Sequence, residues 1–156
     1  MAAKPIPDGY HTLTTYLIVK DSKAAMAFYT KAFGAKEILR LSMPDGSIAH
    51  AEMKVGDSHF MLSDENEQWG NKSPKTLGGT PVGLAIYVDD CDQVFDRAVA
   101  AGATIERPVM DQFYGDRSGT LFDLDGHKWT IGTHKIDMSP AEMQKAMDEW
   151  LKSMGM

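Results

Sequence analysis

The sequence predicts an α+β protein built from two tandem βαβββ modules and a C-terminal amphipathic helix. Strand and helix patterns occur twice in the same order, the two copies keep a nearly constant offset, and the last segment has helical periodicity. We place module one at about 10–63, a linker at 64–81, module two at about 82–134 and the helix at 139–154, within a single domain spanning 1–156.

Each module begins with a short strand that leads into a helix. TTYLIVKD (14–21) ends where Asp21 or Ser22 can accept hydrogen bonds from the first free N–H groups of a helix. That helix carries apolar residues at 25, 28, 29, 32 and 33, and Gly34 is placed to end it. In module two, GLAIYVDD (83–90) precedes a helix with apolar residues at 94, 95, 98 and 99 that stops at Gly102.

A predicted hairpin closes each module, because two alternating stretches flank a tight turn. The segments are HAEMKV (50–55), the Gly56-Asp57 turn and SHFMLS (58–63), then SGTLFD (118–123), a turn with Asp125-Gly126 and HKWTIG (127–132). A two-residue turn pairs Val55 with Ser58, which sets Lys54 opposite His59 and Glu52 opposite Met61.

The spacing of equivalent residues favours a duplication. Asp21 and Asp90, Thr14 and Gly83, and Phe60 and Trp129 are each 69 positions apart, while the helices fit an offset of 67 or 68. Two unrelated α+β halves with the same element order are the alternative, and the shared offset makes it the weaker one.

Between the modules, DENEQWGNKSPKTLGGTP (64–81) is polar and is expected to be a linker or flap without a packed element. Trp69 is its one large apolar residue. It either anchors the loop on the surface, which we favour, or belongs to a lid over a ligand.

The tail has a strong helix-start pattern, with Ser139 as N-cap, Pro140 at the first position and Glu142 at the third. Its apolar residues form one face: Met143, Ala146, Met147, Trp150, Leu151 and Met154. The body of the protein or a second subunit must cover that face.

Composition narrows the class of protein. Of 156 residues, 43% are hydrophobic and 24% charged, which is typical of a globular domain. The net charge of −6 and the scattered basic residues disfavour a nucleic-acid surface. The single Cys91 excludes an internal disulfide, and neither a signal peptide near Met1 nor a membrane-spanning apolar run is recognised. We therefore expect a cytoplasmic protein with no membrane partner.

The stretches FYTKAFGA, YVDDCDQVFDRAVAAGA and RSGTLFDLDGHKWTI closely resemble the vicinal oxygen chelate superfamily, which includes glyoxalase I, bleomycin-resistance proteins and extradiol dioxygenases. From about Tyr10 to the tail, the chain is similar to the PhnB-like, glyoxalase-related branch. The resemblance implies a cup-shaped mixed sheet with helices outside, a site between paired modules, and a homodimer.

Metal enzymes of the superfamily carry ligands at the start of each module's first strand and on its last strand. The resemblance transfers these positions to Thr14, Gly83, Met61 and Thr130, none of which has a usual metal-binding side chain. We therefore expect no metal and no other cofactor at the usual site.

A displaced metal site is the alternative. Strand alternation puts Tyr16 on the face that Thr14 takes, and groups His50, Glu52 and His59 on the non-helical face of the first hairpin. These three could hold a divalent ion. We favour a polar wall that binds a ligand or water, because His50 and His59 are far apart along the hairpin.

Other conspicuous residues receive simpler interpretations. His127 is expected to be exposed, and His134 to border the mouth of the cup or to cap the tail segment, with neither as a metal ligand. Trp129 is expected to pack against the second helix as core. Cys91 starts that helix but has no histidine placed beside it, so a nucleophilic role is not expected.

The segment DQFYGDRSGT (111–120) is open to two interpretations. As a recognition loop, it offers Tyr114 as a hydrogen-bond donor and Arg117 as a clamp for a carboxylate or phosphate. As a structural turn, it uses an Asp116–Arg117 pair and a buried aromatic to fix a dimer contact.

The predicted function is binding of a small organic molecule in the cup. The predicted ligand-binding residues are Thr14, Tyr16, His50, Glu52, Met61, Tyr114, Asp116, Arg117 and Thr130. One alternative is a metal-dependent glyoxalase-like lyase, isomerase or dioxygenase that uses displaced ligands. A further alternative is a protein that sequesters a drug. The identity of the ligand and the presence of catalysis stay open.

Overall fold

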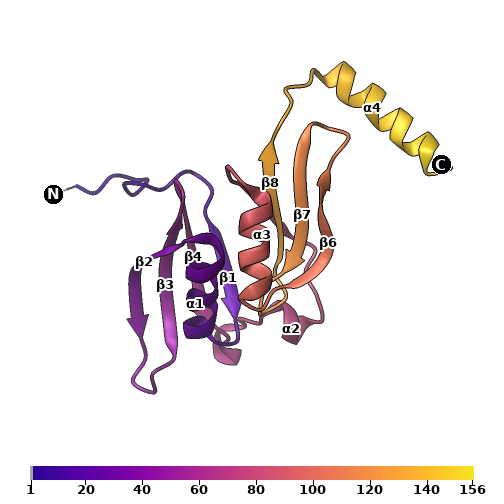
Figure 1. The fold of residues 1–156 in the computed structure, drawn as a ribbon. Coiled ribbons are helices and arrows are strands. Elements are labelled where there is room, and N and C mark those ends of the chain that lie inside the picture. The colour runs from indigo at the N-terminus through magenta and orange to yellow at the C-terminus, as the bar shows by residue number, and fades with distance from the viewer. Residues whose placement is uncertain (1) are drawn as a thin grey trace.

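Both predicted βαβββ modules are present and follow one another along the chain (Figure 1). The computed structural model describes residues 2–156; Met1, the first residue of the predicted domain, lies outside them. Module one consists of β1 (Thr15–Val19), α1 (Ser22–Phe33), β2 (Lys36–Ser42), β3 (Ile48–Val55) and β4 (Ser58–Asp64). Module two consists of β5 (Gly83–Tyr87), α3 (Cys91–Ala100), β6 (Thr104–Asp111), β7 (Asp116–Phe122) and β8 (Lys128–His134).

Each module forms its own mixed four-stranded sheet, in the orders β1-β4-β3-β2 and β5-β8-β7-β6. The first strand of each module runs parallel to the last, and the other pairs are antiparallel. In the β3–β4 hairpin, Val55 pairs with Ser58 and Glu52 with Met61, so the predicted register is confirmed. The α+β class and the module order are confirmed as well.

The duplication extends to the contacts that hold the start of each helix. Asp21 and Asp90, which are 69 positions apart, each accept a 3.0 Å hydrogen bond as N-cap residues. The next N–H group, that of Ser22 or Cys91, donates to a side chain at the end of the last strand. These acceptors, Asp64 and Thr133, are again 69 positions apart, so equivalent strands support equivalent helices.

One hydrophobic core spans both modules, because α1 and α3 pack against each other. Trp129 on β8 is 3% exposed, and its ring centroid lies 4.9 Å from that of Phe33 and 5.6 Å from that of Tyr29 on α1. Trp129 is therefore core, as expected. Its aromatic partners lie in module one, although α3 also packs on β8, so Trp129 fills the junction between modules.

Buried polar groups strengthen this junction. Asp123 accepts hydrogen bonds from the Tyr29 hydroxyl (2.6 Å) and from the Trp129 indole N–H (2.9 Å). The backbone N–H of Lys20 donates to Asp125, and the His127 ring contacts the Ile18 carbonyl at 2.9 Å. His127 is half-buried rather than exposed as expected, because β1 of module one lies against it.

The linker contains two short helices, η1 (Glu67–Trp69) and α2 (Pro74–Leu77), so the expectation of no packed element was wrong. Pro74 is buried, and the Lys75 N–H donates to the Asp125 carbonyl, which ties α2 to module two. The Trp69 side chain is 55% exposed.

The C-terminal helix α4 (Pro140–Ser153) begins with the predicted capping box at Ser139 and Glu142. It projects from module two and has no buried residue (Figure 1). Its apolar face touches the body where Trp150, 44% exposed, stacks on Phe113 with ring centroids 5.4 Å apart. Among residues 2–156, no helix has the length and apolarity needed to cross a membrane.

Candidate ligand-binding faces

Each sheet has one face under a helix and one face turned away from it, which we call the open face. α1 packs on β3 and β4, and α3 packs on β6, β7 and β8. Because side chains alternate along a strand, every second residue belongs to the open face. In module one these include Tyr16, Leu39, Leu41, His50, Glu52, His59 and Met61. In module two they include Tyr87, Arg107, Met110, Asp116, Ser118, Thr120, Thr130 and His134.

A hydrogen-bonded array occupies the open face of module one. The Tyr16 hydroxyl lies 3.0 Å from His50 Nδ1, and His50 Nε2 lies 3.1 Å from Glu52 Oε1. The other carboxylate oxygen, Glu52 Oε2, accepts from the Tyr10 hydroxyl. A neutral His50 with its proton on Nε2 satisfies both of its contacts, accepting from Tyr16 and donating to Glu52. The array thus brings Tyr16, His50 and Glu52 together on one face.

The charge state of the array follows from these contacts. The hydroxyl of Tyr10, and after it the ring of His50, hold the pKa of Glu52 below its ordinary value, so this carboxylate is ionised at neutral pH. Burial and the neighbouring Glu52 raise the pKa of Tyr10 to about 12, so the phenol stays protonated and donates. The open face of module one therefore offers an anionic acceptor.

The three displaced-ligand candidates do not assemble into a metal-holding arrangement. His50 and Glu52 are paired, whereas the imidazole of His59 stacks on the ring of Tyr10 with centroids 4.5 Å apart. Within residues 2–156, no three His, Cys, Asp or Glu side chains stand where together they could hold a metal ion. Of the four positions transferred from metal enzymes, Thr14 directly precedes β1, Gly83 begins β5, and Met61 and Thr130 lie on β4 and β8.

On module two, Asp116 organises one end of the open face. Its carboxylate is 2.7 Å from the Tyr87 hydroxyl and 2.7 Å from His134 Nδ1. His134 also contacts Asp137 at 2.9 Å, and the two carboxylates, Asp116 first, raise its pKa above the ordinary value. His134 therefore lies between Asp116 on the open face and Asp137 of the segment that leads to α4.

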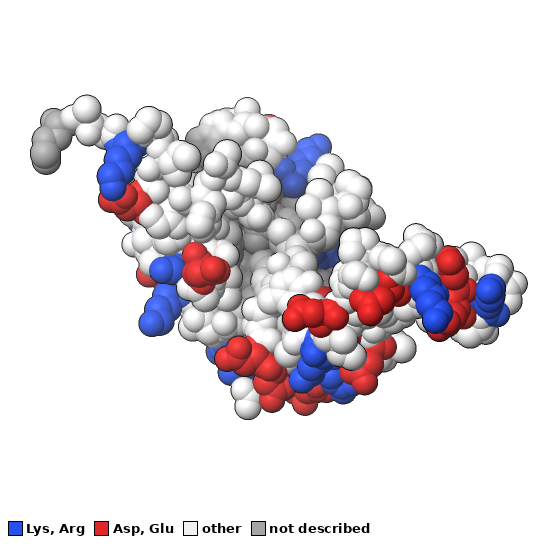
Figure 2. Space-filling model, turned by 90° about the horizontal axis from the view of Figure 1, so that it is seen from above, with Lys and Arg blue, Asp and Glu red and all other residues white. Residues whose placement is uncertain are grey.

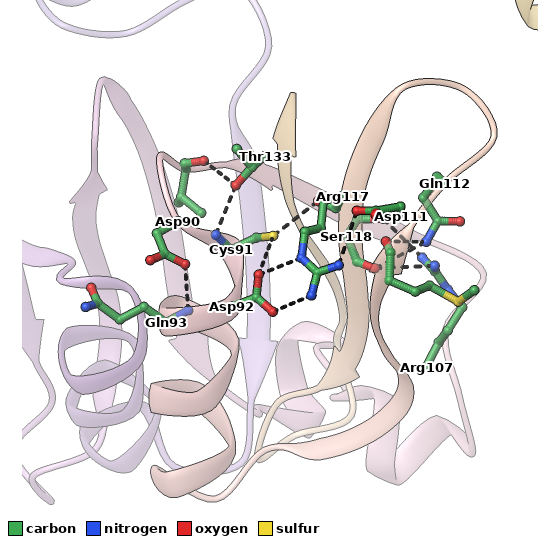
Figure 3. Close-up of polar contacts among 12 residues, drawn as sticks. Asp90, Cys91, Asp92, Gln93, Arg107, Asp111, Gln112, Arg117, Ser118 and Thr133 are labelled. Carbon is green, nitrogen blue, oxygen red and sulfur yellow. Dashed lines mark hydrogen bonds and ion pairs between the residues drawn. The ribbon is translucent and has the colours of Figure 1, made fainter. Parts of the chain in front are cut away.

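Arg117 lies on the opposite face from Asp116, because successive residues of β7 point to opposite sides of the sheet. Its guanidinium donates to both oxygens of Asp92 on α3, at 2.7 and 2.8 Å, and to Asp111 at 3.2 Å (Figure 3). The expected Asp116–Arg117 pair is not formed. Arg117 instead joins α3 to β6 and β7, away from the other predicted ligand-binding residues.

Tyr114 joins the open face of module two to the tail. Its hydroxyl is 3.5 Å from the Ser118 hydroxyl, and its ring meets Phe113 edge-on at 5.2 Å. The ring of Phe113 in turn stacks on that of Trp150 in α4. The segment 111–120 therefore combines a structural turn with hydroxyl groups on the open face, from Tyr114, Ser118 and Thr120.

Arg107 is a candidate that sequence reasoning missed. Its guanidinium contacts the hydroxyls of Thr120 at 3.1 Å and Ser118 at 3.4 Å, and the Thr120 hydroxyl contacts Thr130 at 3.2 Å. Among residues 2–156, no carboxylate pairs with Arg107. The β6–β7 register shifts on either side of Arg107, and these shifts decide which face of the sheet its side chain takes. Simple alternation along the strand therefore did not place Arg107 on the open face.

The Glu52 and Arg107 arrays lie on the two separate sheets of the chain. A cleft of about 910 Å³ does lie between the modules, and Figure 2 shows the molecule hollowed there. Its walls come from β5, α3, the turn of the β3–β4 hairpin and Trp129, and they include His59 and Tyr87 of the two open faces but neither Glu52 nor Arg107. Because α1 and α3 contact each other, the junction between modules is built from the helical sides of the sheets.

Comparison with known proteins agrees with this fold. Residues 10–131 match the model of the Glyoxalase/Bleomycin resistance protein/Dioxygenase superfamily. The chain belongs to this superfamily. It is 41% identical over 138 residues to an uncharacterized protein of Mycobacterium bovis, and the match covers 86% of this chain and 91% of the relative.

Solved structures share the fold. TioX from Micromonospora sp. ML1 has a TM-score of 0.61 and 28% identity, and the match covers 83% of this chain and 100% of TioX. The PhnB protein from Bacillus cereus has a TM-score of 0.62 and 21% identity, over 79% of this chain and 99% of that protein. A PhnB protein is thus among the fold neighbours, in agreement with the branch that the sequence resembles.

Proposed function

We propose that the protein binds a small organic molecule between the module-one open face of one copy and the module-two open face of a second copy, in a cytoplasmic homodimer. The observation that carries this proposal is the pair of separated arrays. One is centred on the anionic Glu52 and the other on the unpaired cation Arg107, and they lie on the open faces of different modules.

The chemistry of the two arrays indicates the kind of ligand. A guanidinium surrounded by hydroxyls suits a carboxylate or phosphate, which Arg binds in a planar, two-pronged fashion. Glu52 accepts from a hydroxyl or amine. Exposed apolar side chains beside the arrays, among them Leu39, Leu41 and Met110, suit the hydrocarbon part of the molecule. We therefore propose a compact ligand with an acidic group at one end and a hydrogen-bond donor at the other.

The opposite charges of Glu52 on module one and Arg107 on module two support the homodimer. In a two-fold symmetric dimer, the same pair of surfaces meets twice, so the Glu52 face of each copy meets the Arg107 face of the other. Displaced-metal catalysis gains no similar support, because no third ligand stands beside His50 and Glu52 among the described residues.

Mixing two variants tests the composite site. A thermal-shift screen of small hydroxylated carboxylic acids supplies the probe, and its binding should be lost in both Glu52→Ala and Arg107→Ala. After subunit exchange between these variants, half of the dimers are mixed and each contains one intact site. About one quarter of the sites should therefore bind the probe again.

Matched controls remove similar charges outside the arrays. Glu37 and Arg40 form an exposed ion pair on β2, so Glu37→Ala and Arg40→Ala should bind the probe like the unaltered protein. The proposal fails if the mixture binds no more probe than the separate variants, or if light scattering gives the mass of one 17.2 kDa chain at the binding concentration.

A further inference from the structure

The N-terminal segment 7–10 lies on the open face of module one. A hydrogen bond of 3.1 Å from the Tyr10 N–H to the Pro7 carbonyl closes a turn there. The ring of Tyr10 stacks on His59, with an interplanar angle of 29°, and its hydroxyl donates to Glu52. Tyr10 therefore contacts two residues that are far from it in the sequence: its ring stacks on the imidazole of His59, and its hydroxyl donates to the carboxylate of Glu52.

Gly9 makes this close approach feasible. Its φ of +83° lies in the left-handed region that favours glycine, and a Cβ there would stand 2.7 Å from Cε1 of His59. Any other residue at this position both strains the backbone and collides with the imidazole. The segment is therefore fitted to His59 by its backbone as well as by the side chain of Tyr10.

Two polar groups beneath the ring of Tyr10, on His59 and Glu52, do not obtain all their hydrogen bonds from strands β1–β4. Nδ1 of His59 is buried and has no hydrogen-bond partner within residues 2–156. The Glu52 side chain is 18% exposed, and its Oε2 receives its hydrogen bond from the Tyr10 hydroxyl. A stacking surface beside an ionised acceptor is a suitable position for a planar ring that carries an O–H group.

We propose that Tyr10 is an internal occupant of a phenol-binding position on the module-one open face, and that segment 7–10 is a strap which a phenolic ligand displaces. This inference rests on the proposed function, since it names the ligand chemistry of one of its two faces. Because the strap is part of the same chain, Tyr10 competes for the position at a high effective concentration. A free phenol binds only to molecules whose strap is released, so its apparent affinity is lowered in proportion to the fraction of such molecules.

The probe is 4-methylphenol, which is the side chain of tyrosine as a free molecule. Tyr10→Ala empties the position and should bind 4-methylphenol at least about tenfold more tightly than the unaltered protein, measured by calorimetry. The matched compound 4-methylanisole has no O–H group and should bind Tyr10→Ala about tenfold more weakly, because a hydrogen bond to a charged acceptor is lost. Adding Glu52→Gln to Tyr10→Ala should remove the preference for the phenol.

A second variant releases the strap without changing the groups that bind the probe. Gly9→Ala should tighten binding of 4-methylphenol, whereas Gly46→Ala should leave it unchanged. Gly46 has a similar φ of +85°, but a Cβ there meets only the end of the Lys23 side chain, at 3.8 Å. Circular dichroism melting of each variant shows that it is folded.

The inference is overturned if folded Tyr10→Ala or Gly9→Ala binds 4-methylphenol no better than the unaltered protein. Equal binding of 4-methylphenol and 4-methylanisole also overturns it. The composite site fails separately: Arg107→Ala in the Tyr10→Ala background should still bind 4-methylphenol, because that position belongs to module one. Retained phenol binding together with failed mixing of variants would reject the composite site and keep the strap.

Discussion

The two modules share a backbone but carry opposite chemistry on their open faces. His50 and Glu52 on β3 correspond by sheet register to Ser118 and Thr120 on β7, and Leu39 on β2 corresponds to Arg107 on β6. Module one thus carries an anionic array under a strap, and module two carries a cationic array without one. The two modules keep equivalent hydrogen bonds at the start of α1 and α3. Their open faces, which are not the faces that α1 and α3 cover, carry different side chains.

The largest expected effect comes from removing the residue that joins the modules. Trp129→Ala should lower the free energy of unfolding by about 3–5 kcal/mol, because it opens a cavity among Phe33, Tyr29 and Phe60. Urea denaturation measures the loss. Trp69→Ala, which changes an exposed tryptophan, is the control and should change stability by less than about 0.5 kcal/mol. A similar small loss for Trp129→Ala would show that the modules are independent.

The equivalent helix supports should differ in strength. Asp64 accepts from the Ser22 N–H at 2.6 Å and from the Ile48 N–H at 2.7 Å, so Asp64→Ala should cost about 2–3 kcal/mol. Its equivalent Thr133 accepts from the Cys91 N–H at 2.9 Å, and Thr133→Ala should cost about 1 kcal/mol. Thermal or urea unfolding of both variants tests the order. The Thr133 hydroxyl also makes a second hydrogen bond, to the Val88 carbonyl at 2.8 Å, so equal losses would mean that the charge of Asp64 adds nothing.

The helical face of module two is more crowded than that of module one. Gly119 occupies the position of Ala51, and a Cβ there would lie 2.6 Å from the ring of Phe95 and 2.9 Å from Val109. Gly119→Ala should therefore cost about 1–3 kcal/mol in denaturant unfolding. Because α1 already accommodates the methyl group of Ala51, a neutral or stabilising Gly119→Ala would show that α3 can shift in the same way.

The smallest expected effects are opposite pH dependences of the two open faces. The pKa of Glu52 is lowered in the folded protein, so its contribution to stability is present above the ordinary pKa and is lost as pH falls through the folded value. The pKa of His134 is raised, so its contribution is present below its ordinary pKa and is lost as pH rises through the folded value.

Variants separate these two contributions. The difference in unfolding free energy between unaltered protein and Glu52→Gln should shrink on acidification from pH 5 to pH 2, which spans the ordinary pKa and the lowered folded pKa. The difference for His134→Ala should shrink when the pH is raised from 6 to 9. If both differences changed in the same direction, the opposite electrostatic assignment of the two faces would be wrong.

Local interactions account for the parts of the molecule that sequence analysis predicted. The caps at Asp21 and Ser139 lie within a few residues of the N–H groups they serve. The two-residue turn at Gly56-Asp57 sets the whole β3–β4 register, including the position of Glu52 opposite Met61. Segment β6 was not assigned in advance, so the guanidinium of Arg107 could not be placed on a face.

The sequence by itself determined the two modules, their order, the C-terminal helix and the residues of the first hairpin that share the face of Glu52, because spacing along the chain controls each of them. Only the tertiary structure decided that Trp129 packs on α1, that Arg117 pairs with Asp92 and that Tyr10 stacks on His59. Those contacts join segments from different elements, and their partners depend on how helices and sheets pack, which no local pattern specifies.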